Sequence, residues 1–196
     1  DAMRYDLEIP DDYGIFQTVG DTVGPGGWAR ALRNIPVFQG LARDIEKICP
    51  DAFVLNYTNP MSVLTNVFYR TSKLKTVGLC HGVFETIDAL KKILGFENRE
   101  DCKLEFAGVN HFFWIIDFDV KGTNGYELLK EKTGGKKLSD VTPELDPLFC
   151  SLYEQFGYLS YSEDRHTCEF FPQYLTGDMK KLEKYKLKRT TIEERK

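Results

Sequence analysis

The sequence has few of the features that mark specialised classes of protein. Lys and Arg (26) are fewer than Asp and Glu (30) among its 196 residues, and the net charge of −4 excludes the strong basic field of a dedicated nucleic-acid binder. No apolar run approaches the ~20 residues that a membrane span needs, and no signal peptide is visible. The five cysteines show no paired spacing, which favours a reduced, cytoplasmic protein over a disulfide framework.

The chain also lacks an initiator Met, and Asp1-Ala-Met-Arg4 is not typical of a natural start. We therefore expect it to begin part-way through a fold. Its apolar fraction of 42% is ample for a core, and its length fits one or two small domains.

Hydrophobic periodicity in the first half predicts helices that alternate with short strands. Apolar residues recur at three- and four-residue steps from Gly27 to Ile48, which predicts an amphipathic helix that bends at Pro36. The apolar run Ala52–Asn56 is typical of a buried parallel strand. Thr58 or Asn59 is expected to cap the next helix, with Pro60 as its first residue. A second strand over Leu74–Leu79 and a helix over Glu85–Leu94 complete a right-handed parallel α/β unit.

The sequence pattern changes after Asp101. The segments Leu104–Val109 and Phe113–Val120 are rich in β-formers, and Lys130–Lys137 is expected to be an exposed loop. A short helix is predicted over Pro147–Phe156, and the charged tail from Lys180 is expected to be a solvated helix or a frayed end. We predict an α/β fold: the second part of a Rossmann-like parallel sheet in residues 1–100, then part of an α+β substrate and metal domain in residues 101–196.

Polar residues follow both predicted parallel strands, where such sheets bind ligands. Asn56, Thr58 and Asn59 follow the first strand, and Cys80 and His81 follow the second. A capping turn would explain one Asn of the first group but not all three polar residues. A buried Cys beside a surface His is the structural alternative for the second group.

Two further clusters contain the remaining histidines. His111 ends Gly108-Val-Asn-His111, and His166 lies in Glu163-Asp-Arg-His166 with Glu169 close behind. The structural alternatives are a packed histidine beside aromatics and a solvated charge run. Imidazole with thiolate suits a borderline-soft divalent metal, whereas carboxylates suit Mg²⁺ or Mn²⁺. The spacing of a zinc finger is absent, so a structural zinc site is not expected.

A glycine-rich segment from Gly20 to Gly27 leads into the first predicted helix, whose N-terminus favours an anion. The segment is neither a Walker loop nor the dinucleotide fingerprint, because no Gly-Lys-Ser/Thr follows it and no strand directly precedes it. Arg30 and Arg33 lie a turn or so into the helix, where they can contact an anionic or hydroxyl-rich ligand.

Taken in order, these clusters resemble glycoside hydrolase family 4. The matching stretches are Asp21-Thr-Val-Gly-Pro-Gly-Gly27 with Arg30-Ala-Leu-Arg33, Asn56-Tyr-Thr-Asn-Pro-Met61, Gly78-Leu-Cys-His81, Gly108-Val-Asn-His111, and Asp164-Arg-His166 with Glu169. The first and last look most similar to the α-galacturonidase branch. The phospho-sugar branch typically has Asn or Asp after the metal-binding Cys, so His81 indicates an unphosphorylated sugar.

The resemblance implies an unusual, NAD-dependent glycosidase mechanism rather than the usual pair of carboxylates. In this family NAD⁺ oxidises the sugar at C3, a base removes the acidified C2 proton, and the C1–O bond is eliminated. Water then adds, and the hydride returns to C3. A divalent metal, usually Mn²⁺, stabilises the negative charge that develops.

Carried over to this sequence, the resemblance makes Cys80 and His111 the metal ligands. Asn59 matches the Asn that binds sugar hydroxyls, and His81 lies where an acid near the leaving oxygen is placed. The C2 base falls on Asp164 or His166, because the usual Tyr is missing. The resemblance further implies that Asn110, Arg30 and Arg165 bind substrate, with Arg165 able to hold a carboxylate. Asn56 and Thr58 are expected to contact NAD.

The family's first strand and its glycine-rich NAD loop have no counterpart here, and its enzymes are roughly twice this length. We therefore expect a central fragment, or a truncated relative that binds NAD poorly. The leading hypothesis is an α-galacturonidase, with an α-galactosidase or α-glucosidase as alternatives; the family commonly forms dimers or tetramers. An inactive sugar-binding remnant is the alternative from another class. A plain NAD-dependent dehydrogenase would leave Cys80 and His111 unexplained.

Overall fold

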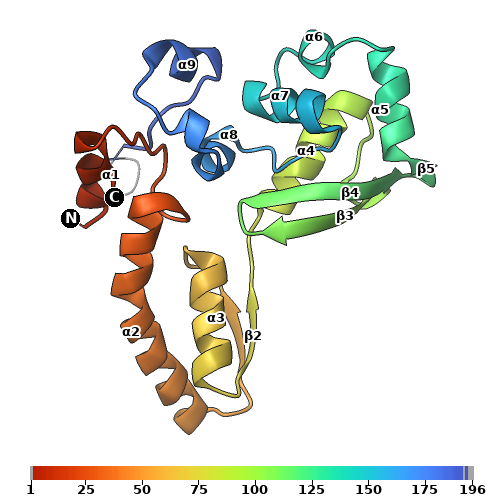
Figure 1. Ribbon diagram of the computed structural model, residues 1–196. Helices are drawn as coiled ribbons and strands as arrows, with labels where there is room; N and C mark the ends of the chain where they lie inside the picture. Colours follow the sequence, from red (N-terminus) through yellow and green to blue (C-terminus); the bar gives the residue numbers. More distant parts are fainter. Residues whose placement is uncertain (1, 192, 194–196) are drawn as a thin grey trace. The chain divides into compact units, whose positions relative to one another are not determined.

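The computed structural model describes residues 2–191 and 193, which separate into two compact units (Figure 1). Unit 1 contains the described residues of Asp1–Cys80, Glu169–Gly177 and Arg189–Lys196. Unit 2 contains His81–Cys168 and Asp178–Lys188. Each unit is therefore built from segments that are distant in the sequence.

Unit 1 contains a parallel strand–helix–strand unit, as predicted. Strands β1 (Phe53–Asn56) and β2 (Lys75–Gly78) pair in parallel from Phe53 opposite Lys75 to Asn56 opposite Gly78. The crossover between them is α3 (Met61–Thr71). Two helices precede this unit, α1 (Ala2–Asp12) and α2 (Gly24–Ile48). The structure confirms the mixed α/β class.

The helix boundaries of unit 1 differ from the predicted ones in three places. Helix α1 was not predicted, and α2 begins three residues earlier than the periodicity indicates, with Pro25 in its first turn. Pro60 is the N-cap of α3 rather than its first helical residue, and the Asn59–Pro60 peptide bond is cis. Pro36 lies inside α2, so the long helix continues through it as expected.

The core of unit 1 lies between α2, α3 and one face of the two-stranded sheet. Ala42 and Phe68 are buried there with Leu74, and the ring of Phe38 packs edge-on against Phe68 at a centroid distance of 5.8 Å. The opposite face of β1 is open in the described structure: Phe53 and Leu55 are each 60% exposed. The prediction of a fully buried strand is therefore wrong for this chain, because its helices cover only one face of the sheet.

Unit 2 is built on an antiparallel hairpin, with helices α4 to α7 gathered on one side of it (Figure 1). Strands β3 (Cys102–Val109) and β4 (Phe112–Val120) pair in antiparallel register around the turn at Asn110 and His111, and the short β5 (Thr123–Asn124) extends β4. The helices of this unit are α4 (Gly82–Leu94), α5 (Gly125–Thr133), α6 (Leu138–Val141), α7 (Pro147–Phe156), α8 (Asp164–Thr167) and α9 (Met179–Lys184). A single 3₁₀ turn covers Arg99–Asp101 in this unit; two more cover Cys168–Phe170, where the chain passes into unit 1, and Pro172–Tyr174 of unit 1.

Two segments of unit 2 correct the sequence interpretation. Residues up to Thr133 of the predicted Lys130–Lys137 loop belong to α5, which ends at a left-handed C-cap, Gly134. At the start of this helix Asn124 is the N-cap and accepts a hydrogen bond from the Glu127 amide at 3.1 Å. The predicted surface helix near Lys180 exists as α9, and its Leu182 is buried, so this part of the tail is anchored. No helix among the described residues is both long and apolar enough to cross a membrane.

The core of unit 2 supplies a direct test of the sheet register. Ile115 and Ile116 are neighbours on β4, but Ile115 is fully buried and Ile116 is 50% exposed. We expect Ile115→Ala to lower the free energy of unfolding by ~2–5 kcal/mol, because it leaves a cavity in a packed core. The matched variant Ile116→Ala should cost well under 1 kcal/mol. Urea unfolding of both variants measures the difference, and equal losses would contradict the assigned register.

Candidate active site

The turn after β1 is organised by the buried side chain of Asn56. Its Nδ2 donates to Thr65 Oγ1 at 3.0 Å and to the Met61 carbonyl at 3.3 Å, and its Oδ1 accepts from the Thr58 amide at 3.0 Å. These bonds occupy both amide hydrogens and one acceptor site. Asn56 therefore holds the turn through its own side chain.

The other predicted residues of this turn face a different environment. Thr58 is exposed, and Asn59 is half-buried, with its Oδ1 accepting from the Met61 amide at 3.3 Å. Arg30 of α2 donates from Nε to the Asn59 carbonyl at 3.0 Å. The structure thus brings together two residues that were predicted to bind sugar, and this contact uses one of the five N–H donors of the guanidinium.

Cys80 follows β2 and is half-buried. Of the other four thiols, Cys102, Cys150 and Cys168 are buried and Cys49 is exposed. Burial raises the pKa of Cys102 to about 11 and that of Cys150 to about 12, so both remain protonated at neutral pH. Cys80 is the thiol that follows a strand of the parallel sheet.

His81 is the N-cap of α4, and its side chain is exposed. Its Nε2 lies 3.0 Å from Glu85 Oε1, one turn along the helix, and Tyr161 donates its hydroxyl hydrogen to Glu85 Oε2 at 3.1 Å. The carboxylate therefore orients the imidazole and is itself fixed by a phenol. This geometry is typical of a positioned acid–base histidine.

His111 lies in the β3–β4 turn with a left-handed backbone (φ 63°) and is buried. Its imidazole stacks on the ring of Tyr161 at a centroid distance of 5.5 Å and an interplanar angle of 10°. The ring of His166 lies on it at 3.9 Å with a tilt of 36°. Asn110, the preceding turn residue, is half-buried. Two histidines from separate predicted clusters therefore meet within unit 2.

Asp164 has a structural role. Its Oδ2 accepts from the Leu148 amide at 2.6 Å and its Oδ1 from the Phe149 amide at 2.8 Å, so both oxygens satisfy N–H groups in the first turn of α7. Burial raises the pKa of Asp164 to about 8; the nearby Asp146 carboxylate raises it further, and the two backbone bonds oppose this. Asp164 is therefore a buried helix cap rather than part of a solvated charge run. Arg165 and His166 follow on α8, both half-buried.

The side chain of Gln17 occupies part of the N-terminus of α2, where an anion site was expected. Gln17 is fully buried, accepts from the Gly26 amide at Oε1 (2.7 Å) and donates from Nε2 to the Val23 carbonyl (2.9 Å). This side chain caps α2 from within the loop. Arg33 is paired with the buried Asp6 of α1, with one nitrogen–oxygen distance of 2.8 Å, so it braces the two helices.

Glu169 holds the other end of the same loop. Its Oε1 accepts from the amides of Val19 at 2.7 Å and Gly20 at 2.8 Å, although 149 or more residues separate them in the sequence. Burial raises the pKa of Glu169 to about 7, against these hydrogen bonds. Sequence reasoning assigned no role to Gln17 or Glu169. Glu169 belongs to the last matched motif, and it is a carboxylate in the otherwise apolar run Cys168–Phe171.

The chain belongs to family 4 of the glycosyl hydrolases. Residues 1–96 match the profile described as "Family 4 glycosyl hydrolase", and residues 106–196 match "Family 4 glycosyl hydrolase C-terminal domain". The resemblance inferred from the motif order is thereby confirmed.

Named relatives are similar over most of this chain. It is 39% identical over 177 residues to an "Alpha-galactosidase" of Bacillus subtilis, covering 90% of this chain and 40% of the relative. It is 38% identical over 190 residues to an "Alpha-galacturonidase" of the same species (88% and 43%), and 39% identical over 186 residues to one from Thermoanaerobacter italicus (87% and 41%). The chain thus spans about two fifths of these relatives.

Solved structures share the fold. The crystal structure of the "putative glucosidase lplD" of Bacillus subtilis superposes with a TM-score of 0.82 at 36% identity, covering all of this chain and 48% of that one. A 6-phospho-alpha-glucosidase from gut microorganisms, solved in complex with NAD and Mn²⁺, has a TM-score of 0.68 at 22% identity, over 88% of this chain and 41% of that one.

The two buried carboxyls predict the pH dependence of stability. The pKa of Asp164 rises from 3.8 to about 8 and that of Glu169 from 4.5 to about 7, so the folded chain holds these protons more tightly than the unfolded chain. The free energy of unfolding should therefore fall as the pH rises from about 4 to about 8. Asp164→Asn keeps a capping oxygen but cannot ionise, and should reduce this slope by up to ~1.4 kcal/mol per pH unit.

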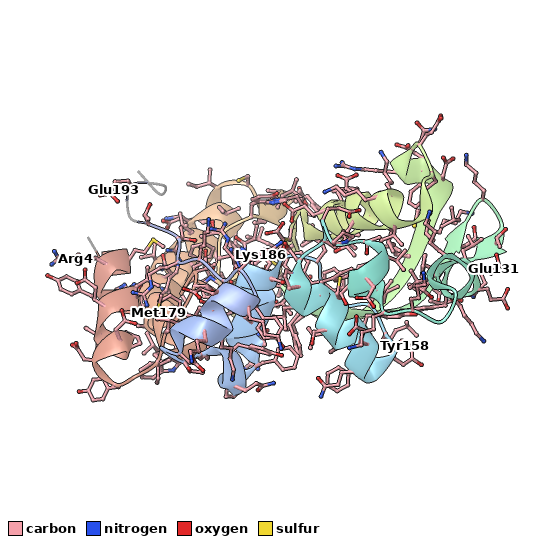
Figure 2. All side chains as sticks on the ribbon, turned by 90° about the horizontal axis from the view of Figure 1, so that it is seen from above. Arg4, Glu131, Tyr158, Met179, Lys186 and Glu193 are labelled. Atoms are coloured by element: carbon pink, nitrogen blue, oxygen red, sulfur yellow. The ribbon has the colours of Figure 1, made fainter. Side chains whose placement is uncertain are left out.

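Urea unfolding at intervals across this pH range measures the slope. Glu131→Gln is the control, because Glu131 is an exposed carboxylate on α5 (Figure 2). An unchanged slope in Asp164→Asn would contradict the assigned pKa shift.

Proposed function

We propose that the protein is a glycosidase for α-glycosides of an unphosphorylated sugar, with α-galacturonide as the favoured substrate. The observation that carries the proposal is the buried imidazole of His111, which the β3–β4 turn and Tyr161 hold in one orientation. Family membership and the relatives named alpha-galacturonidase support the substrate class. The order of the motifs supports the NAD-dependent oxidation–elimination–addition–reduction mechanism over direct displacement.

The donor set fits a divalent transition metal. His111 offers a buried imidazole, and Cys80 is a half-buried thiol at a strand end. Imidazole and thiolate are ligands for such ions, and the relatives solved with Mn²⁺ support that ion as the natural one. When bound, the metal would supply Lewis-acid stabilisation of charge on the sugar oxygens, and NAD⁺ would accept and return the hydride.

Several residues of the chain have chemistry that suits sugar binding. We assign Asn59 and Arg30 to hydroxyl groups, since the Arg30–Asn59 hydrogen bond fixes both near the end of β1. Arg165 on α8 suits a substrate carboxylate, because a guanidinium binds carboxylates in a bidentate manner. Asn110, beside His111, is assigned to a substrate hydroxyl, and Thr58, exposed after β1, to the cofactor.

His81 is assigned to protonate the leaving oxygen. Glu85 holds its Nε2 at 3.0 Å, and exposure leaves the ring in reach of a substrate. Of the two predicted C2 bases, Asp164 uses both oxygens on α7, and the position of His166 on His111 favours another role, argued below. The base is therefore left unassigned. A dimer or tetramer is proposed from the family alone.

Hydrolysis of aryl α-glycosides tests the proposal. We expect the purified protein to cleave aryl α-galacturonide faster than the α-galactoside or α-glucoside, and only with Mn²⁺, NAD⁺ and a reductant present. Deuterium at C2 of the sugar should slow the reaction, because that proton is removed. Hydrolysis that continues without metal and NAD⁺ would contradict the mechanism. Sugar binding by calorimetry without turnover would favour the sugar-binding remnant.

Substitution of one thiol tests the metal assignment. Cys80→Ser should lower metal-dependent activity by at least a hundredfold, since a hydroxyl is a much weaker metal ligand than a thiolate. Cys49→Ser removes the exposed thiol and serves as the control. Full activity of Cys80→Ser would refute the assignment.

A further inference from the structure

We propose that His166 is a second imidazole ligand of the divalent ion that we assign to His111, so that unit 2 alone supplies two nitrogen ligands. This inference rests on the metal site of the proposed function. The rings of the two histidines lie 3.9 Å apart, and a ring nitrogen of one lies within 4.8 Å of a ring nitrogen of the other.

The distance is compatible with a shared ion. A bond from imidazole nitrogen to a transition metal is ~2.1 Å long, so two nitrogens on one ion stand at most ~4.2 Å apart. At the tetrahedral angle the two nitrogens stand ~3.4 Å apart, so from a separation of at most 4.8 Å they close by at most ~1.4 Å to bind the same ion. Rotation of one side chain about its own torsions is sufficient for such a movement.

The backbone holds both rings in place. His111 is fixed by the tight turn and by Tyr161 behind its ring. His166 lies on α8, which Asp164 ties to α7; next to it, Thr167 donates from Oγ1 to the Tyr161 carbonyl at 3.2 Å and from its amide to the Glu163 carbonyl at 3.0 Å. Ligands on an ordered backbone lose little conformational entropy when the ion binds.

A second imidazole changes the expected metal preference. Nitrogen and sulfur donors favour Co²⁺, Ni²⁺ or Zn²⁺ over Mg²⁺, whereas oxygen donors favour Mg²⁺ and Mn²⁺. With His166 as a ligand, the chain should bind Co²⁺ more tightly than Mn²⁺ and should not bind Mg²⁺ appreciably.

Metal binding without substrate or NAD⁺ tests the inference. Calorimetric titration with Co²⁺, and electron paramagnetic resonance of unbound Mn²⁺, measure affinity directly. His166→Phe keeps a flat ring against His111 but has no nitrogen, and it should weaken binding of Co²⁺ at least tenfold. Cys49→Ser removes an exposed thiol with no assigned role and should leave the affinity unchanged.

A second measurement needs no variant. Acylation of His166 by diethyl pyrocarbonate, followed by mass spectrometry, should slow when Co²⁺ is added to the wild-type chain, while acylation of His81 should not. Equal rates with and without Co²⁺ would overturn the inference even if His166→Phe does not fold.

The outcomes separate the inference from the proposed function. If His166→Phe binds Co²⁺ as tightly as the wild type but loses hydrolysis, His166 is the C2 base and the inference fails. If both histidines are needed for Co²⁺ binding but no glycoside is hydrolysed, the inference stands and the proposed function fails.

Discussion

Backbone N–H groups that are buried away from water need hydrogen-bond acceptors. In this chain, two buried carboxyl groups of a predicted site segment accept hydrogen bonds from backbone amides. Asp164 accepts from the first turn of α7, and Glu169 accepts from Val19 and Gly20. An amide left without an acceptor would cost ~1–3 kcal/mol, which is a large fraction of the stability of a small domain. The conformation of the predicted site segments therefore depends on two acids that do not take part in the proposed chemistry.

These two acids also explain why the short segment from Asp164 to Glu169 is ordered without being a long helix. It contains only α8 and one 3₁₀ turn, so its own backbone hydrogen bonds are few. Asp164 fixes its beginning within unit 2, and Glu169 fixes its end within unit 1. Burial of both carboxyls makes ionisation costly, as their raised pKa values show. In the protonated form that the raised pKa values favour, each carboxyl still offers oxygen acceptors to the backbone amides.

Much of the fold follows from local patterns in the sequence. Periodicity predicts α2, α4 and α7, and alternation of strand and helix predicts the parallel β1–β2 pair. The order of the motifs predicts the family. The local pattern does not reveal which side of β1 is covered, because that depends on packing partners, and Phe53 and Leu55 remain exposed.

The candidate site is less completely predictable, and the reason is physical. His, Cys and Asn residues that could bind a ligand can be recognised from their side-chain chemistry and from their positions after predicted strands. The roles of Asn56, Asp164, Gln17 and Glu169 depend on which backbone group each reaches, and the partners of Glu169 lie 149 or more residues away. A buried Asp that caps a helix and an Asp that removes a proton look alike in a sequence. Hydrogen-bond partners distinguish them only once the chain is folded.

Tyr161 connects the two kinds of histidine in unit 2. Its hydroxyl donates to Glu85, which holds the exposed His81, while its ring stacks on the buried His111. Its backbone is fixed at both ends, since its amide donates to the Phe113 carbonyl at 3.1 Å and its carbonyl accepts from Thr167. A rigid aromatic ring can hold an imidazole without competing for its nitrogens, which a hydrogen-bonding side chain would do. Tyr161 therefore positions one buried imidazole through its ring and one exposed imidazole through Glu85.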